Sequence, residues 1–441
     1  MLEEFKNAGF KIIRFALPIY SGTFIVSVIG FVNMMLLSKH DQHILYLLSA
    51  FMPCYFCMLA FQETWRSVTI GIVTRFKKTS YLMSLIVMII LSAFISSFIL
   101  YSGFLLFKGD ICKLLSIGYG LQLNFIALTQ QLLIGHIFSV TVAILNSVVL
   151  SLGYPILSAG FNILLSLSIF LLTQLDLLSN INVLHQYAYH YTWIHILFTF
   201  ILIFFVFSKV FKNSDSNSLA PKSIQCFKII CAQIKNIGLP VFLLWFVLLF
   251  GVYIFNHLLA QCSLTVMKGY NLVYRLQMLV YQPALALGIA TAILVQRHVS
   301  NDLLQSAWHI IKTGIQLSSL IYFFIGMILF LFRHPIALSL TTDLSVQHVV
   351  QECLSYTAIG WCVSGPVVTW LTLLEQTGYA ILATCFQAFY FISLQYATKL
   401  FVVPTQNTLL FYRLLLISSI FSFIVFSAFP LLKRKILFSN Q

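Results

Sequence analysis

Long stretches of apolar residues recur along the whole chain and are separated by short polar segments. Each stretch reaches the roughly 20 residues that a helix needs to cross the hydrocarbon core of a bilayer. The apolar residues run continuously instead of alternating with polar ones, which predicts helices and excludes the strands of a membrane barrel. We predict twelve membrane-spanning helices, at residues 12–37, 44–73, 80–107, 123–147, 155–175, 187–208, 237–258, 270–296, 308–332, 353–374, 379–400 and 408–430.

The composition agrees with a protein that faces lipid over most of its surface. Hydrophobic residues make up 60% of the chain and charged residues only 8%, whereas soluble domains carry about 25% charged residues. The net charge of +14 comes from Lys and Arg near the ends of the spans, mostly on alternate connecting segments. The positive-inside rule then predicts a multi-pass protein of the cell (inner) membrane with both termini in the cytoplasm. Because the basic residues follow the span ends, they do not indicate nucleic acid as a partner. No cleavage site follows the first apolar segment, so we expect this span to be retained.

One connecting segment is long and polar, and it divides six predicted spans from six. It covers residues 209–235 and contains the run Asn213-Ser214-Asp215-Ser216-Asn217-Ser218, a composition typical of a solvated connection. We therefore predict an N-terminal lobe at residues 1–208, a cytoplasmic linker at 209–235 and a C-terminal lobe at 236–441.

The two halves share short sequence matches in the same order and at a nearly constant offset. Because each half has an even number of spans, the copies would have the same orientation, which is a parallel repeat. Such repeats enclose a central cleft and open it to alternate sides of the membrane, as carriers do. The matched segments are Leu17-Pro18 with Leu239-Pro240, Arg75 with Arg297, and Gly153-Tyr154 with Gly378-Tyr379.

Two charged residues, Glu63 and Arg66, lie well inside the second predicted span. Their spacing of three residues places them on one face of a helix, where they can pair. A charge at the bilayer centre costs roughly 2.5–3.5 kcal/mol on insertion scales, so such residues face a cavity or each other. Two interpretations stay open: a neutralised pair that holds helices together, or a carboxylate that exchanges a proton or a cation during transport.

The eighth span carries a polar stripe that ends near a proline. Its members are spaced as one face of a helix, and Pro283 then removes a backbone hydrogen bond and favours a bend. This face suits the wall of a substrate cleft; the alternative is that Arg275 extends to the membrane interface. The candidate cleft residues are Asn271, Tyr274, Arg275, Met278 and Gln282.

Other polar residues inside the spans have simpler explanations. Hydrogen bonding between helices accounts for a lone amide such as Asn33 or Asn162. Buried histidines such as His136 and His195 are more often packed residues than proton relays. We find no catalytic motif, no spacing typical of metal ligands and no nucleotide-binding loop, so the sequence predicts neither an enzyme nor a cofactor or metal site.

At this point the chain resembles the multidrug and toxic compound extrusion (MATE) family of the multidrug/oligosaccharidyl-lipid/polysaccharide exporter superfamily. The order and spacing of four segments carry the resemblance over most of the chain, and it is strongest in the second half. They are Gly238-Leu239-Pro240, echoed by Ala16-Leu17-Pro18; Tyr274-Arg275-Leu276 through Pro283 and Gly288; Leu340-Thr341-Thr342-Asp343; and Gly378-Tyr379, echoed by Gly153-Tyr154.

The resemblance implies an all-α membrane protein with two parallel six-helix repeats that form a V-shaped pair of lobes. It also implies antiport of a cationic or amphipathic organic compound against H⁺ or Na⁺. Asn162 matches the asparagine of the family's cation site in the first lobe. Where the family commonly has an acidic residue late in the first span, this chain has Val32-Asn33. Glu63, with Arg66 as its charge partner, is a candidate replacement for that carboxylate.

Two alternatives to an exporter remain open. A flippase for lipid-linked oligosaccharides would share the lobed architecture, but it calls for a strongly basic cavity, and only Arg66 and Arg275 lie deep in spans. A membrane transferase would need a polar catalytic loop, and the loops here are short. For an exporter we expect a small organic substrate, H⁺ or Na⁺, and a chain that works as a monomer within the lipid bilayer.

Overall fold

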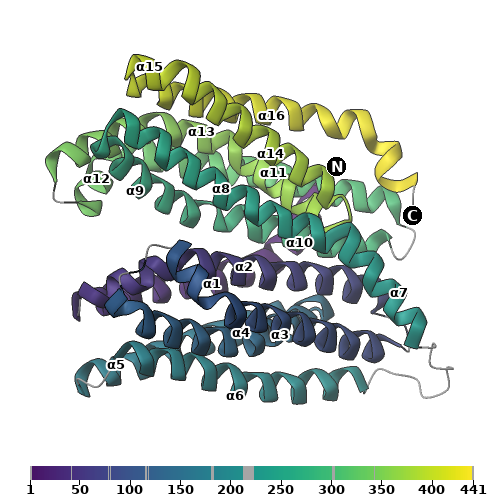
Figure 1. Cartoon of the computed structure of the whole chain (residues 1–441). Helices are drawn as coiled ribbons and strands as arrows, with labels where there is room; N and C mark the ends of the chain where they lie inside the picture. The colour runs from purple at the N-terminus through teal and green to yellow at the C-terminus, as the bar shows by residue number, and fades with distance from the viewer. Residues whose placement is uncertain are drawn as a thin grey trace. The chain divides into compact units, whose positions relative to one another are not determined.

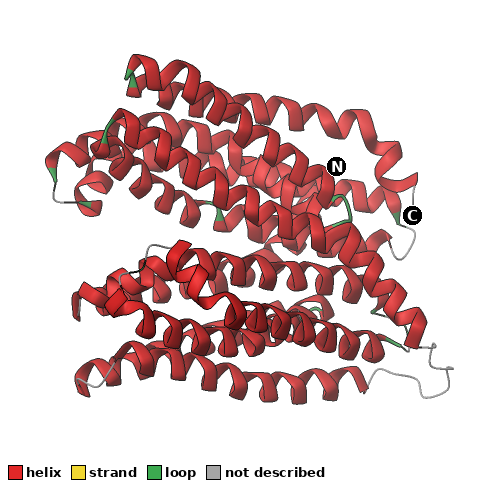
Figure 2. Ribbon diagram, in the orientation of Figure 1, coloured by secondary structure: helices red, strands yellow, loops and turns green. Residues whose placement is uncertain are grey.

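The computed structural model describes residues 2–439 except 41, 78, 80, 115–116, 118, 180–182, 212–222, 300–302 and 342. Within these residues the chain is helical, with short connections and no strand (Figure 2). The first half contains α1 (Leu2–His40), α2 (Gln42–Phe76), α3 (Leu82–Leu114), a 3₁₀ turn (Tyr119–Leu121), α4 (Gln122–Leu152), α5 (Pro155–Ser179) and α6 (Val183–Phe211) (Figure 1).

The second half is divided into more pieces. It contains α7 (Ser223–Gln233), a π-helical turn (Ile234–Gly238), α8 (Leu239–Cys262), α9 (Leu264–Val280), α10 (Gln282–Val299), α11 (Leu304–Leu331), α12 (Arg333–Leu340), α13 (Leu344–Gln376), α14 (Ala380–Ala397), a second π-helical turn (Thr398–Val402), α15 (Val403–Thr405) and α16 (Thr408–Ser439).

Eleven helical stretches within the described residues are long and apolar enough to cross a membrane. They coincide with all the predicted spans except the second, which lies in α2, the helix that carries Glu63 and Arg66. The predicted all-helical membrane fold is confirmed. The helices run further than the predicted spans at several ends, because hydropathy marks the apolar part of a helix and not its polar last turn.

The chain forms two compact units that exchange segments between its halves. One unit consists of Ser21–Phe242, and the other of Met1–Tyr20 together with Leu243–Gln441. The start of α1 therefore packs with helices of the second half, while α7 and the start of α8 pack with helices of the first half. The lobe boundaries at 208 and 236 stay a prediction, and residues 212–222 of the predicted linker lie outside the described residues.

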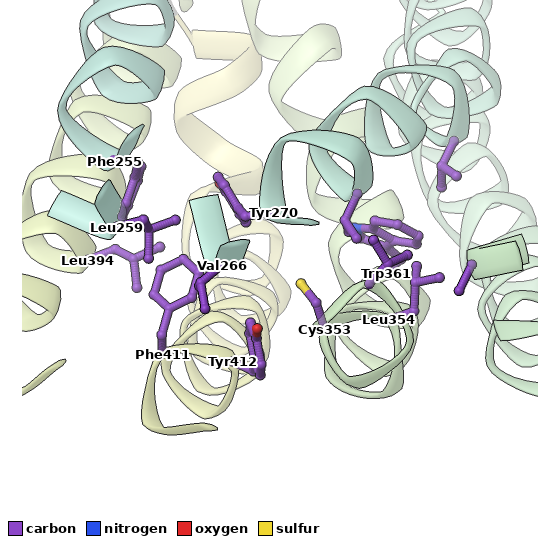
Figure 3. Packing of buried hydrophobic residues seen from close by; sticks show 14 of the residues in the cluster. Phe255, Leu259, Val266, Tyr270, Cys353, Leu354, Trp361, Leu394, Phe411 and Tyr412 are labelled. Carbon is purple, nitrogen blue, oxygen red and sulfur yellow. The ribbon is translucent and has the colours of Figure 1, made fainter. Parts of the chain in front are cut away.

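Each unit is built around one buried helix. In the Ser21–Phe242 unit α4 is almost wholly buried and packs against α2, α3, α5 and α6. In the other unit α13 holds this place, with α9, α10, α11 and α16 around it. Figure 3 shows part of the apolar cluster beside α13, where Tyr270, Phe411 and Tyr412 pack near Cys353. Because α4 and α13 are the fourth and tenth predicted spans, the buried helices agree with a repeat.

The two central helices also end alike. Gly153 and Gly378 follow α4 and α13 with φ angles of 105° and 96°, in the left-handed region that glycine adopts without steric cost. The residues after them, Tyr154 and Tyr379, donate their backbone N–H groups to carbonyls in the last helical turn, as in a Schellman cap. The matched Gly-Tyr segments of the sequence therefore do the same structural job in both halves.

Side chains at the end of the second span of each half satisfy a last carbonyl of each central helix. Lys77, just after α2, donates from Nζ to the carbonyl oxygen of Leu152 at 2.6 Å. Gln296 in α10 donates from Nε2 to the carbonyl oxygen of Gln376. Carbonyls at helix ends need such partners because no intrahelical N–H group reaches them.

Candidate functional site

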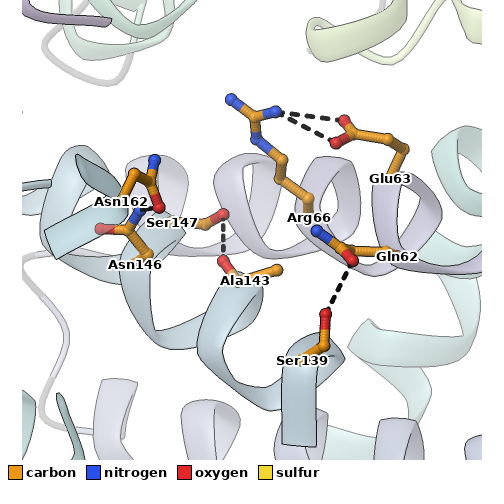
Figure 4. Close-up of polar contacts among 8 residues, drawn as sticks. All are labelled: Gln62, Glu63, Arg66, Ser139, Ala143, Asn146, Ser147 and Asn162. Atoms are coloured by element: carbon orange, nitrogen blue, oxygen red, sulfur yellow. Dashed lines mark hydrogen bonds and ion pairs between the residues drawn. The ribbon is translucent and has the colours of Figure 1, made fainter. Parts of the chain in front are cut away.

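The polar residues of α2 lie on two sides of the helix. Glu63 and Arg66 form an ion pair in which Arg66 Nη1 is 3.1 Å from one carboxylate oxygen and 3.3 Å from the other. Each of the two side chains is 23% exposed, so the pair is neither fully solvated nor sealed in the core. Gln62 is directed toward Ser139 on α4, whereas Glu63 and Arg66 extend from the other side of α2 (Figure 4).

The contact between Gln62 and Ser139 explains how α2 is held against the central helix. The Ser139 hydroxyl donates to Gln62 Oε1 at 3.0 Å, so that the buried hydroxyl and the amide oxygen satisfy each other. At the same interface the rings of Phe61 and His136 pack edge to face. Since α2 is fixed on this side, the opposite side with Glu63 and Arg66 can remain partly exposed.

A second polar contact joins α4 to α5. Asn146 Nδ2 donates to Asn162 Oδ1 at 2.7 Å, and Asn146 is only 7% exposed (Figure 4). The side-chain oxygen of Asn146 has no hydrogen-bond partner among the described residues, and neither has that of Asn33 in α1, which is 6% exposed. Buried amide oxygens without a donor suit a cation or a donating water.

The structure thus brings Asn162 together with Asn146, and Glu63 together with Arg66. It places Asn33 in the buried interior of the same unit without a described hydrogen bond from its side-chain oxygen. Hydrogen bonding between helices, the simpler explanation for Asn162, is what the side chain does. Its role as an ion ligand, like the roles of Asn33 and Glu63 in coupling, stays a prediction.

The stripe on the eighth span divides into an inner and an outer part. Tyr274 packs against the apolar cluster of its unit, with its ring 6.2 Å from that of Tyr270. Arg275 is exposed and Met278 is 40% exposed. The helix is interrupted at the predicted bend, since α9 ends at Val280 and α10 begins at Gln282, next to Pro283. Asn271 and Gln282 are half-buried.

One contact between a carboxylate and a histidine has no counterpart among the contacts predicted from the sequence. His190 Nε2 in α6 lies 2.8 Å from Asp176 Oδ2 in α5, and both side chains are mostly buried. The two residues belong to different helices, and no spacing in the sequence indicates that they meet. His195 lies five residues further along α6. Its Nδ1 is 2.6 Å from the carbonyl oxygen of Tyr191, a contact expected of a packed, hydrogen-bonded histidine.

The described residues contain no group of three His, Cys, Asp or Glu side chains placed to hold a metal ion. Cys54 packs among the apolar side chains around Cys112 and Phe51, as expected of a core cysteine in a helix.

Two compact helical units, each with a buried central helix that ends in the same way, are consistent with a fold built from internal repeats. Comparison with known proteins identifies this fold. Residues 237–401 match the MatE family model. None of the curated protein sequences compared with the chain matches it.

Solved structures extend the likeness to the whole chain. A MATE transporter of Vibrio cholerae, in an Asp-to-Asn mutant form, has a TM-score of 0.88 at 13% identity over 99% of this chain and 100% of its own. A transporter of the MOP superfamily from Pyrococcus furiosus, described as having a binding pocket of reversed polarity that suggests a different function, has a TM-score of 0.86 at 14% identity over 98% and 96%. An outward-facing multidrug resistance MATE family transporter has a TM-score of 0.84 at 15% identity over 98% and 97%.

The resemblance predicted from the sequence is therefore confirmed. The second half of the chain contains a MatE domain, and the chain as a whole has the fold of MATE transporters of the MOP superfamily.

Proposed function

We propose that the protein is a secondary active exporter of cationic or amphipathic organic compounds, driven by antiport with H⁺ or Na⁺ through alternating access. The observation that carries this proposal is the Glu63–Arg66 pair within a chain of MATE fold. Charged residues are costly inside a membrane span and by default indicate a functional site. Partial exposure matters because a carboxylate that water can reach is able to exchange its partner for a proton or a cation.

The ion pair supports a simple coupling scheme. When Glu63 is ionised it holds Arg66 through both carboxylate oxygens. When Glu63 takes up a proton, or turns to bind a sodium ion or a cationic substrate, this hold is lost and Arg66 needs another partner. Binding of a proton or a cation at Glu63 and the position of the Arg66 guanidinium group are therefore linked. Antiport requires such a link, because the ion and the substrate use one site in turn.

A second candidate function is export or flipping of an anionic, lipid-linked substrate. The observation that favours it is the exposed guanidinium of Arg275 on α9, in a chain with a net charge of +14. The transporter from Pyrococcus furiosus shows that one fold of this superfamily has been associated with different pocket polarities. A cationic substrate calls for Glu63, whereas an anionic substrate calls for Arg275.

Transport by purified protein in liposomes tests these proposals. We expect an imposed proton or sodium gradient to drive movement of organic cations, and Glu63→Gln to abolish it. Asp110→Asn is the matched control, because Asp110 and Lys113 also stand three residues apart but are 77% and 82% exposed and 4.0 Å from each other.

Full transport by Glu63→Gln would remove Glu63 from the coupling mechanism. Movement of no organic cation, together with movement of an anionic lipid-linked sugar that Arg275→Gln abolishes, would replace the exporter by the flippase.

A further inference from the structure

The break between α9 and α10 has a feature that Pro283 alone does not explain. Proline lacks an N–H group, so only the hydrogen bond from position 283 to the carbonyl of Leu279 must be absent. The next bond of an unbroken helix would join the N–H of Ala284 to the carbonyl of Val280. In the structure the hydroxyl of Tyr322, from α11, stands between these two groups.

Tyr322 replaces one helical hydrogen bond by two. Its hydroxyl accepts from the N–H of Ala284 at 3.1 Å and donates to the carbonyl of Val280 at 2.6 Å. On either side the helical bonds resume, because Tyr281 donates to Gln277 and Leu285 donates to Tyr281. Insertion of a side chain into the hydrogen-bond ladder is a known cause of helix kinks. The hydroxyl therefore acts as a wedge in the eighth span.

The structure provides a fitted place for the wedge. Tyr322 is completely buried, and its ring lies against Gly365 of α13, where a Cβ atom would overlap the ring. Any residue larger than glycine at position 365 would push the ring, and with it the hydroxyl, out of line.

Both sides of the break are attached to α13. Tyr281, on the α9 side, has its hydroxyl 2.9 Å from Ser364 Oγ. Thr369 Oγ1 donates to the carbonyl of Ala284 at 3.2 Å, and Ser318 Oγ of α11 is 2.8 Å from the same Thr369 oxygen. The kink is thus held by hydroxyl groups from two neighbouring helices.

We propose that Tyr322 is a positioning residue that switches the eighth span between a bent and a straight form. In the bent form the Tyr322 hydroxyl satisfies Ala284 and Val280. In the straight form these two groups satisfy each other, the carbonyl of Leu279 stays without a helical donor, and the Tyr322 hydroxyl gives up both of its partners. The two backbone groups keep a partner in either form, so the forms differ in free energy by the hydrogen bonds of one hydroxyl, a difference small enough for a bistable element.

Straightening would turn α9 relative to α10 and redirect the face that carries Asn271, Arg275 and Met278. The structural part of this inference stands by itself, and only its effect on transport rests on the proposed function. The first-half counterpart of the span, α2, is one uninterrupted helix from Gln42 to Phe76, so the wedge belongs to the second half.

Distance measurements between spin labels test the wedge without reference to transport. Labels carried by non-natural amino acids at two exposed positions, Lys268 on α9 and Leu320 on α11, report the direction of α9 by pulsed electron resonance. In Tyr322→Phe, which keeps the ring and loses both hydrogen bonds, we expect the ratio of straight to bent molecules to rise by roughly tenfold. Tyr390→Phe is the matched control, because it likewise removes a tyrosine hydroxyl, a partly buried one that accepts from the Ser418 side chain of α16 at 3.2 Å.

Two further measurements separate the wedge from a general loss of packing. Pro283→Ala restores the missing N–H group and should favour the straight form in addition to Tyr322→Phe. In liposomes Tyr322→Phe should change the maximal transport rate more than the substrate concentration at half-maximal rate. An unchanged distance distribution in a folded Tyr322→Phe protein overturns the proposal, whereas an altered distribution without any transport activity counts against the proposed function only.

Discussion

Removing Glu63 and Arg66 one at a time and then together measures how strongly the two residues depend on each other. The perturbations are Glu63→Gln, which keeps the length of the side chain, Arg66→Gln, which removes the charge and shortens the side chain by two atoms, and the double variant. Each side chain is 23% exposed, so the pair lies between a fully exposed ion pair and a fully buried one.

The magnitude follows from those limits. Exposed ion pairs contribute about 0–1 kcal/mol, whereas removing one partner of a fully buried pair costs about 3–5 kcal/mol. We therefore expect Glu63→Gln to destabilise the protein by about 2 kcal/mol, since it leaves a guanidinium group that cannot lose its charge. Arg66→Gln should cost less, because an unpaired carboxylate can take up a proton. The double variant should lie within about 1 kcal/mol of the native protein, which corresponds to a coupling of at least about 1 kcal/mol.

The measurement is the free energy of unfolding in bicelles. It is obtained by steric trapping, in which a bulky ligand binds tags on the protein only when the protein is unfolded. The Asp110 and Lys113 pair serves as the reference, and because it is exposed and 4.0 Å apart its coupling should be close to zero. If the losses of the two single variants simply add in the double variant, Glu63 and Arg66 do not stabilise each other. The partly buried ion pair would then contribute nothing to the free energy of unfolding.

Three other perturbations test separate parts of the structure. Asn162→Leu deprives Asn146 of its acceptor and should cost about 1–3 kcal/mol in the same unfolding assay, while Asn162→Asp, which keeps an acceptor, should cost less. Gly378→Ala forces a side chain into the left-handed region and should cost about 1–2 kcal/mol; an unchanged stability would mean that the cap can relax. Asp343 caps α13, and hydrogen bonds, chiefly from the Ser345 side chain, hold its pKa below the ordinary value. The ionised Asp343 side chain should therefore stabilise the protein at pH values above its ordinary pKa, and this stabilisation should fade as the pH falls through the lowered pKa. In Asp343→Asn, the thermal unfolding temperature should depend less on pH between pH 2 and pH 6.

Hydropathy predicted the helices well because lipid imposes a simple rule on the sequence. A segment that satisfies its own backbone and presents apolar side chains must be a helix, whatever its neighbours are. The bend at Pro283 was also predictable, since a missing N–H group is a property of one residue. The repeat could be found because Gly153 and Gly378 need the same unusual backbone conformation.

Contacts between helices were beyond the sequence for a different reason. Tyr322 and Ala284 are far apart in the chain, and no local pattern indicates that a hydroxyl on one helix enters the backbone of another. The pair of Asp176 and His190 was hidden in the same way. Of the candidate site, the partnership of Glu63 with Arg66 was accessible because three residues along a helix fix the distance between two side chains.

The make-up of the two compact units has a consequence for how the protein is produced. A ribosome completes the Ser21–Phe242 unit with the first 242 residues, so this unit can assemble in the membrane while the rest of the chain is still being translated. The other unit needs Met1–Tyr20, which are translated before Ser21–Phe242, and Leu243–Gln441, which are translated after it. Residues Met1–Tyr20 must therefore wait in the bilayer, without their final neighbours, until Leu243–Gln441 have been made. A nascent chain that stalls soon after Phe242 would leave one finished bundle and the unpartnered segment Met1–Tyr20, a form that membrane quality control could recognise.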